Sequence, residues 1–432
     1  MGPELLLLVL TAAAVGAAVG TFTGLVPGIH VNTLAAVLFT SYPAVETALA
    51  GRIGTDAVPL LVSCGIMSAA AVHSFVDFVP SVFVGAPDAD EALSVLPGHR
   101  LLTEGRGMAA VRAAAAGSAV GAACALLLAV PVQWMMLHGL AGIMDSLTPF
   151  VLVGTLGIML IAEDRRLLTL VVMLVAGFLG FAVMDAGIPA AGVLGESTLL
   201  FPLLTGLFGL PPLLERKTQT ALPPQTDDGC DPVGPGPGLR GVLTGLLAGW
   251  YPGITATVGA SLASAFGRER DPARFISLTA SIGTVTAVFA VVTLSVSGSG
   301  RSGTALIVKE ILGEELGGFC SETFVLLLFS IAAASALGYA ATIGTGRLMV
   351  RLTDRLPAEL LTNAVLTLIG VLVLLLTGIW GLAVLAVAAA VGMVPPAAGT
   401  SRVPLAACLI VPALLGQLGW DSTALSFMGW PL

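Results

Sequence analysis

The chain has 432 residues, of which 56% are hydrophobic and only 10% are charged, and its formal net charge is −8. Soluble domains carry about 25% charged residues, so this composition excludes a soluble globular protein. The 18 basic residues form no basic patch, which excludes a nucleic-acid-binding protein. At roughly 20 apolar residues per crossing, the length predicts an all-α polytopic protein of the cell membrane with about 10–12 membrane segments.

The first predicted helix ends in an unusual stretch, Gly20-Thr-Phe-Thr-Gly-Leu25, followed by Pro27 and Gly28. Proline has no backbone N–H and clashes with the preceding turn, whereas glycine accepts dihedral angles that other residues avoid. The helix must therefore break at membrane depth, where a break is tolerated only if protein surrounds it or it lines a cavity. We expect a new half-helix to start near Pro27 with its positive end exposed.

His73 and Asp77 follow in the next apolar segment. They are four residues apart, so they share one face if the helix continues through them. An ionisable pair at membrane depth is costly, which favours a role in binding a coupling ion or a proton. The alternative is a structural pair whose members satisfy each other at a helix interface.

A polar linker over 215–240, rich in proline and glycine, divides the chain into a first repeat, 1–214, and a second, 241–432. Gly241-Val-Leu-Thr-Gly-Leu246 repeats the earlier glycine motif, and Pro252-Gly-Ile254 then repeats the Pro-Gly break after four extra residues. We therefore predict two internal repeats with Pro-Gly-broken helices or re-entrant hairpins. Paired breaks of this kind indicate a transporter binding site, although Pro and Gly also kink ordinary membrane helices.

The second half also contains a Gly/Ser run, Ser295-Val-Ser-Gly-Ser-Gly-Arg-Ser-Gly-Thr304. Successive N–H groups in such a run can form a nest for an anion, and Arg301 can bind a carboxylate or phosphate through two hydrogen bonds. The alternative is a flexible turn outside the membrane. The five cysteines show no Cys-x-x-Cys spacing, so we expect no metal site and no cofactor.

Several of these motifs, taken in order along the chain, resemble the TctA family, the large permease subunit of tripartite tricarboxylate transporters, and especially its shorter archaeal-type branch. The matching text is Gly24-Leu-Val-Pro-Gly-Ile-His-Val-Asn-Thr33, His73-Ser-Phe-Val-Asp-Phe-Val-Pro-Ser-Val-Phe-Val-Gly-Ala-Pro87, Ala92-Leu-Ser-Val-Leu-Pro-Gly-His-Arg100, Gly105-Arg-Gly107, Leu204-Thr-Gly-Leu-Phe-Gly209, Tyr251-Pro-Gly-Ile254 and Arg301-Ser-Gly303. The resemblance implies an all-helical fold of two repeats and uptake of citrate-like di- or tricarboxylates driven by a cation gradient. It also implies a small membrane subunit and an extracytoplasmic binding protein as partners.

Residues and resemblance together predict a secondary permease for an organic anion, coupled to Na⁺ or H⁺, that forms a homo-oligomer among membrane lipids. The predicted substrate-binding residues surround the two breaks and the Gly/Ser run: Pro27, Gly28, Ile29, His30, Asn32, Thr33, Pro252, Gly253, Thr255, Thr257, Arg301 and Ser302. His73 and Asp77 are the predicted coupling-ion or proton residues.

The same anion site would also suit a translocase for a polyprenyl phosphate, a lipid carrier, if it opened sideways to the bilayer. We expect no enzyme, because the sequence has no His-Glu-x-x-His and no Gly-x-Ser-x-Gly motif.

Overall fold

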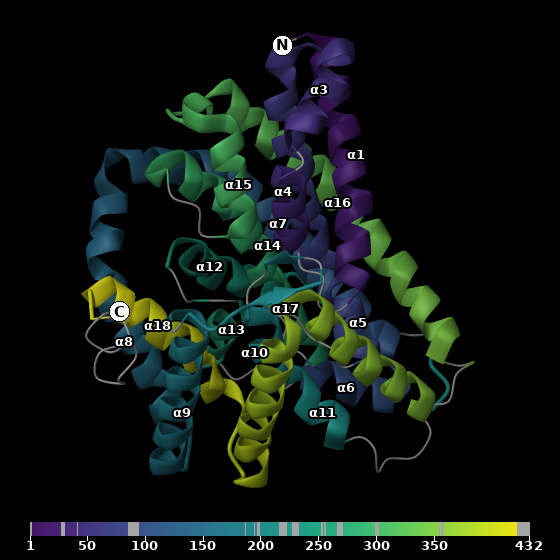
Figure 1. The fold of residues 1–432 in the computed structure, drawn as a ribbon, viewed down its shortest axis with the longest axis vertical. Helices are drawn as coiled ribbons and strands as arrows, with labels where there is room; N and C mark the ends of the chain where they lie inside the picture. The colour runs from purple at the N-terminus through teal and green to yellow at the C-terminus, as the bar shows by residue number, and fades with distance from the viewer. Residues whose placement is uncertain are drawn as a thin grey trace.

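The computed structural model describes most of the chain, and every structural statement below refers to these residues: 2–26, 31–40, 42–84, 95–185, 187–193, 195–196, 199–215, 223–226, 233–251, 254, 256–265, 271–298, 302–353, 355 and 358–420. Long helices dominate the fold (Figure 1). Apart from helices and turns, a hairpin of two-residue strands is present, with β1 (Ala191–Gly192) antiparallel to β2 (Gly195–Glu196).

The helices of the first half, in chain order, are α1 (Pro3–Leu25), α2 (Val31–Thr40), α3 (Tyr42–Ile53), η1 (Thr55–Ala57), α4 (Val58–Val76), α5 (Phe78–Phe83), α6 (Val95–Thr103), α7 (Gly107–Met135), η3 (Met136–Leu140), α8 (Ala141–Ile161), α9 (Arg166–Asp185), α10 (Leu200–Leu204), η4 (Thr205–Gly209) and α11 (Leu210–Glu215). Those of the second half are α12 (Gly236–Trp250), α13 (Ala256–Ala265), α14 (Pro272–Ser297), α15 (Gly303–Leu312), η6 (Gly313–Leu316), α16 (Glu322–Thr353), α17 (Ala358–Ala397), η7 (Val403–Ala406) and α18 (Ala407–Leu418).

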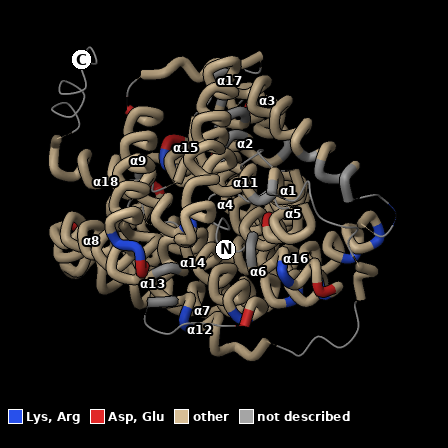
Figure 2. The backbone as a smooth tube through the Cα atoms, turned by 90° about the horizontal axis from the view of Figure 1, so that it is seen from below, with Lys and Arg blue, Asp and Glu red and all other residues tan. Residues whose placement is uncertain are grey.

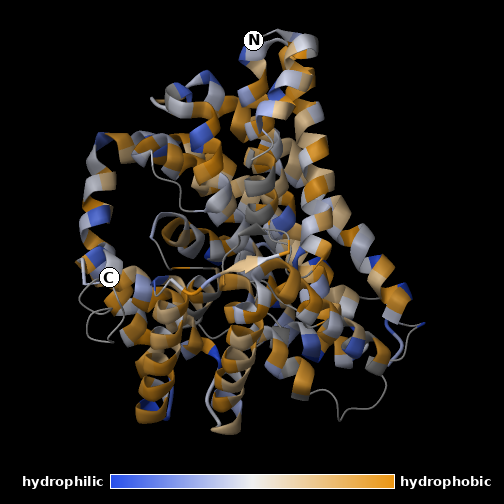
Figure 3. Cartoon of the chain, in the orientation of Figure 1, coloured by the Kyte–Doolittle hydropathy of each residue, from blue (hydrophilic) through white to orange (hydrophobic). Residues whose placement is uncertain are grey.

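Seven helical segments in the described part are long and apolar enough to cross a membrane. One of them, Gly107–Ile161, has 55 residues and is interrupted at Gly139, whose φ of 111° favours glycine. At 1.5 Å per residue it is long enough for two crossings. Charged residues are sparse along the backbone (Figure 2), and hydrophobic residues run the length of the outer helices (Figure 3). The predicted all-α polytopic membrane fold is therefore confirmed.

Helices α4 and α14 form the centre of the molecule. Within their apolar spans, 78% of the residues around α4 and 83% of those in α14 are buried inside the protein, compared with 28% in α1. Helix α7 of the first half packs on α14, and α16 of the second half packs on α4. Farther along, α9 packs on α18 and α17 packs on η4. The two halves are therefore interlocked rather than lying side by side.

Glycines make these contacts close. Ideal methyl groups added at Gly117 and Gly121 of α7 would overlap the backbone of Ser277 and Ser281 of α14. Small residues allow helix backbones to approach closely in membranes, where helices cannot gain hydrophobic energy by leaving water. The small residues of α7 thus form a surface on which the two halves of the chain pack together.

The helices before the two breaks pack in the same way, α1 on α4 and α12 on α14. Three glycines of each helix face partners in the same order: Gly16, Gly20 and Gly24 face Ser68, Val72 and Val76, and Gly241, Gly245 and Gly249 face Ser281, Val285 and Phe289. The second set of glycines follows the first by 225 positions, and so does Pro252 after Pro27. Packing therefore favours a register between the breaks without the four extra residues that the sequence motif suggests.

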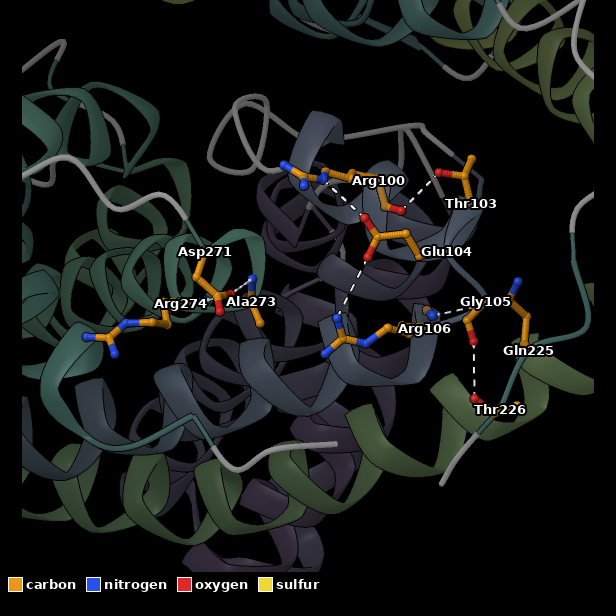
Figure 4. A network of polar contacts seen from close by, with 11 residues as sticks. Arg100, Thr103, Glu104, Gly105, Arg106, Gln225, Thr226, Asp271, Ala273 and Arg274 are labelled. Carbon is orange, nitrogen blue, oxygen red and sulfur yellow. Dashed lines mark hydrogen bonds and ion pairs between the residues drawn. The ribbon is translucent and has the colours of Figure 1, made fainter. Parts of the chain in front are cut away.

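The predicted linker is partly attached to the protein. The side-chain oxygen of Gln225 accepts a hydrogen bond from the backbone N–H of Gly107 at 3.0 Å, and its amide nitrogen donates to the carbonyl oxygens of Leu102 and Pro223 at 3.0 and 2.8 Å. Figure 4 shows Gln225 near the exposed ion pairs of Glu104 with Arg100 and Arg106. Helix α12 then starts at Gly236, within the predicted linker.

Candidate functional site

Both predicted helix breaks are present. Helix α1 ends at Leu25 and the next described helix begins at Val31, while α12 ends at Trp250 and α13 begins at Ala256. The capping residues Val26 (φ −98°, ψ 101°) and Tyr251 (φ −84°, ψ 127°) are both extended. Each precedes a proline, and a proline disfavours helical dihedrals in the residue before it. The two breaks therefore share a local cause.

Much of the predicted binding set lies outside the described residues, namely Pro27, Gly28, Ile29, His30, Pro252, Gly253, Thr255 and Arg301. Asn32 and Thr33 lie in the first turn of α2, and Thr257 lies in the first turn of α13, but their side chains are not described. Asn32, Thr33 and Thr257 are thus at the N-terminal ends of two helices, and their role in binding stays a prediction.

Ser302, also predicted to bind substrate, has a structural task. Its hydroxyl oxygen accepts a hydrogen bond from the backbone N–H of Ala305 at 3.2 Å and lies 2.9 Å from the hydroxyl of Thr304. Ser302 is thus the N-cap of α15, a role for which serine is strongly preferred. Helix α15 packs on both α2 and α4, so the segment after the Gly/Ser run lies beside the first half-helix.

The first break lies against α4. Val31, the first residue of α2, is buried against Ala69 and Ala70. His73 is buried one turn farther along α4, and its Nδ1 lies 3.0 Å from the hydroxyl of Thr23 in the last turn of α1. That hydroxyl in turn donates to the carbonyl oxygen of Gly20 at 3.2 Å. The sequence prediction included His73 but missed Thr23, although Thr23 belongs to the repeated glycine motif.

This contact connects two helices that are far apart in the sequence. The ring of His73 on α4 and the hydroxyl of Thr23 on α1 share one hydrogen bond, and its direction depends on the tautomer of His73. His73 therefore has a structural role, because it holds the last turn of α1 on the central helix α4.

Asp77 follows on the same side of α4. Its backbone N–H donates to the carbonyl oxygen of His73 at 3.0 Å, which keeps the two residues one helical turn apart. Asp77 is 6% exposed, and Gly24 packs directly over this turn. The predicted ionisable pair therefore packs beside the first break, because Gly24 lies three residues before Pro27.

The second break is built differently. The indole N–H of Trp250 donates to a carboxylate oxygen of Asp145 at 3.1 Å, which connects the end of α12 to α8 of the first half. The hydroxyl of Thr293 on α14 donates to the carbonyl oxygen of Gly249 at 3.1 Å. Trp250, Tyr251 and Ile254 are all buried around the break. Sequence reasoning missed Asp145, because nothing in its neighbourhood indicates a partner 105 residues away.

Comparison with known proteins identifies the family to which this chain belongs. A family model described as the tripartite tricarboxylate transporter TctA family matches residues 10–407. The chain belongs to this family. TctA proteins are components of tripartite membrane transporters, so the protein is a multi-pass transporter component, and the resemblance inferred from its motifs is confirmed.

Among curated proteins, this TctA-family chain is similar to uncharacterized protein MJ1079 of Methanocaldococcus jannaschii. The two are 27% identical over 304 residues, which cover 67% of this chain and 70% of the relative. No solved structure matches the chain. Among the described residues of this TctA protein, no group of three or more His, Cys, Asp or Glu side chains is placed to hold a metal ion.

Proposed function

We propose that this TctA-family protein is a secondary active permease for a small organic anion, a di- or tricarboxylate, bound between the two helix breaks and coupled to Na⁺ or H⁺. The observation that carries the proposal is the pair of breaks, each directly before a half-helix and each packed on a buried central helix. Free N–H groups and the positive dipole at a helix N-terminus favour a carboxylate.

The proposal assigns different tasks to the parts of the site. The N-terminal turns of α2 and α13, with Asn32, Thr33, Thr255 and Thr257, donate hydrogen bonds to the anion. Arg301 neutralises its remaining charge. His73 and Asp77 carry the coupling ion or proton beside the first break, because ionisable residues at membrane depth are costly and favour a functional role.

The interlocked halves suit such a permease. Helices α4 and α14 each contact long helices from both halves, so a movement of one half against the other changes the surroundings of both breaks together. We infer that the two halves arose as repeats and that the bound anion lies between them. A small membrane subunit and an extracytoplasmic binding protein complete the proposed transporter, as the family name implies.

The first test is ligand-induced thermal stabilisation of the purified protein in detergent. A ligand that binds only the folded state must raise the melting temperature. At a concentration of 100 times its Kd, it adds about 2.7 kcal/mol to the free energy of unfolding. We expect citrate or a simpler dicarboxylate to do so, and uptake of the same compound into proteoliposomes should follow a cation gradient. Stabilisation by a short-chain polyprenyl phosphate alone would contradict the proposal and support lipid translocation.

Variants at the breaks give the second test. Gly28→Val and Gly253→Val should each abolish uptake while the protein still purifies as a folded species, because a branched side chain obstructs the half-helix N-terminus. Gly154→Val is the matched control, since a methyl group at Gly154 in α8 would meet no atom within 4 Å. Normal uptake by both break variants would refute the assignment.

A further inference from the structure

The junction between α4 and α5 carries oxygen atoms that helix bonding does not use. Helix α4 ends at Val76 and α5 begins at Phe78, with Asp77 between them. Pro80 has no backbone N–H, so the carbonyl oxygen of Val76 loses the donor that an uninterrupted helix would supply four residues later. This main-chain oxygen lies next to the Asp77 carboxylate in the chain.

The hydroxyl of Ser81 is a third oxygen-containing group at this junction. Ser81 is 1% exposed, and in the part of the chain that the structure describes its Oγ atom makes no hydrogen bond. Buried hydroxyl groups nearly always have a partner, so this atom requires an explanation. The backbone N–H of Ser81 donates to the carbonyl oxygen of Asp77 at 3.3 Å, which sets the two side chains one helical turn apart on one face.

The corresponding part of α14 in the second half has none of these features. The packing partners on α14 follow those on α4 by 213 positions, as Ser281 follows Ser68. At the same spacing, Ala290 corresponds to Asp77, Thr293 to Pro80 and Leu294 to Ser81. Helix α14 continues without interruption through these positions to Ser297. The carboxylate, the hydroxyl and the helix interruption therefore occur together at the end of α4 and not at the corresponding positions of α14.

We propose that the α4–α5 junction is a binding site for a dehydrated Na⁺ ion, formed by the Asp77 carboxylate, the Ser81 hydroxyl and the Val76 carbonyl oxygen. Hard cations prefer such oxygen ligands, and broken helices in transporters bind Na⁺ through carbonyl oxygens of this kind. The ion also neutralises a carboxylate that is costly at membrane depth. The inference rests on the proposed function, and it adds that the cation site belongs to the first half alone.

The site accounts for the position of the first break. Gly24, in the last turn of α1, packs against the backbone of His73 and Asp77. Binding of Na⁺ at the junction therefore fixes the surface on which the end of α1 rests, close to the start of half-helix α2. Through this contact, a cation bound at Asp77 helps to position the N-terminal end of α2, where the proposed anion binds.

The test measures the melting temperature of the purified full-length protein against NaCl concentration, without any organic anion and with choline chloride holding the ionic strength constant. Wild-type protein should show a saturable rise with Na⁺, whereas KCl should produce a much smaller one. Ser81→Ala should raise the half-saturating Na⁺ concentration about tenfold, which corresponds to about 1.4 kcal/mol. Asp77→Asn should abolish the rise.

Ser335→Ala is the control variant, because Ser335 on α16 is also buried but its hydroxyl bonds to Ile331 of its own helix at 2.8 Å. It should leave the Na⁺ dependence unchanged. If Asp77→Asn does not fold, the half-saturating Na⁺ concentration of Ser81→Ala is by itself a sufficient test of the site. An equal response to Na⁺ and K⁺, or an unchanged midpoint in Ser81→Ala, overturns the cation site.

The outcome is separable from that of the anion proposal. Stabilisation by citrate or a dicarboxylate without any Na⁺ effect would leave the permease standing and refute this site. A Na⁺ effect that depends on Ser81, without stabilisation by any carboxylate, would retain the cation site and refute the proposed substrate class.

Discussion

Nδ1 of His73 and the hydroxyl of Thr23 lie 3.0 Å apart, and this contact joins the last turn of α1 to the central helix α4. Thr23→Val keeps the shape of the side chain but removes the hydroxyl that bonds to the histidine ring. A buried polar group left without its partner costs about 1–3 kcal/mol, so we expect a clear fall in melting temperature.

Thr21→Val provides the comparison on the same helix. Among the described residues, the Thr21 hydroxyl donates to the carbonyl oxygen of Ala17 in its own helix, at 2.8 Å. Its loss should change stability by no more than about 0.5 kcal/mol. Equal effects of the two substitutions would show that the contact with His73 does not stabilise the protein.

Close contact between the halves should make Gly180 intolerant of even one methyl group. The added carbon of Gly180→Ala would overlap the backbone carbonyl of Cys408 in α18. Overpacking costs about 1–3 kcal/mol, and more where backbone must move. We expect poor yield of monodisperse protein by size-exclusion chromatography. Gly157→Ala in α8, where the added carbon meets nothing within 4 Å, should behave like wild type or better.

Gln225 should hold the linker on the turn between α6 and α7. Gln225→Ala removes three hydrogen bonds and leaves the N–H of Gly107 without its acceptor, a loss of about 1–3 kcal/mol. We expect faster cleavage of the linker in limited proteolysis. Thr226→Val, which retains the backbone bond from Thr226 to Gly105, should be cleaved at nearly the wild-type rate.

The bond from Trp250 to Asp145 should position the second break. Trp250→Phe keeps a buried ring but removes this hydrogen bond to a charged group, which is worth about 1.5–3 kcal/mol. We expect the apparent affinity for the transported anion to fall about tenfold, measured as the half-saturating concentration for uptake. Trp134→Phe, at a ring that is 50% exposed, should not change it.

What the sequence predicted well was local. A proline determines the backbone of the residue before it, so the ends of α1 and α12 followed from Pro27 and Pro252 alone. The ionisable pair His73–Asp77 was equally visible, because its members are one turn apart on the same helix. These features need no knowledge of what packs against them.

What the sequence could not predict was which distant surfaces meet. The glycines of α7 indicate close packing but do not say that α14 is the partner, and an amide such as Gln225 bonds equally well to many backbone groups. Ser81 looked like an ordinary helical serine. Only the structure shows that its hydroxyl is buried beside Asp77 without a hydrogen bond in the described part of the chain.

The interlocking of the halves has a consequence for biosynthesis. Helix α4 is complete at Val76, but α16, which covers it, begins only at Glu322. At synthesis rates of roughly 5–20 residues per second, the nascent chain must wait about 10–50 s before that cover emerges from the ribosome. Until then the face of α4 that contacts α16 is exposed to lipid or to the insertion machinery. Productive assembly of this protein therefore depends on retaining an unfinished first half in the membrane until the second half arrives.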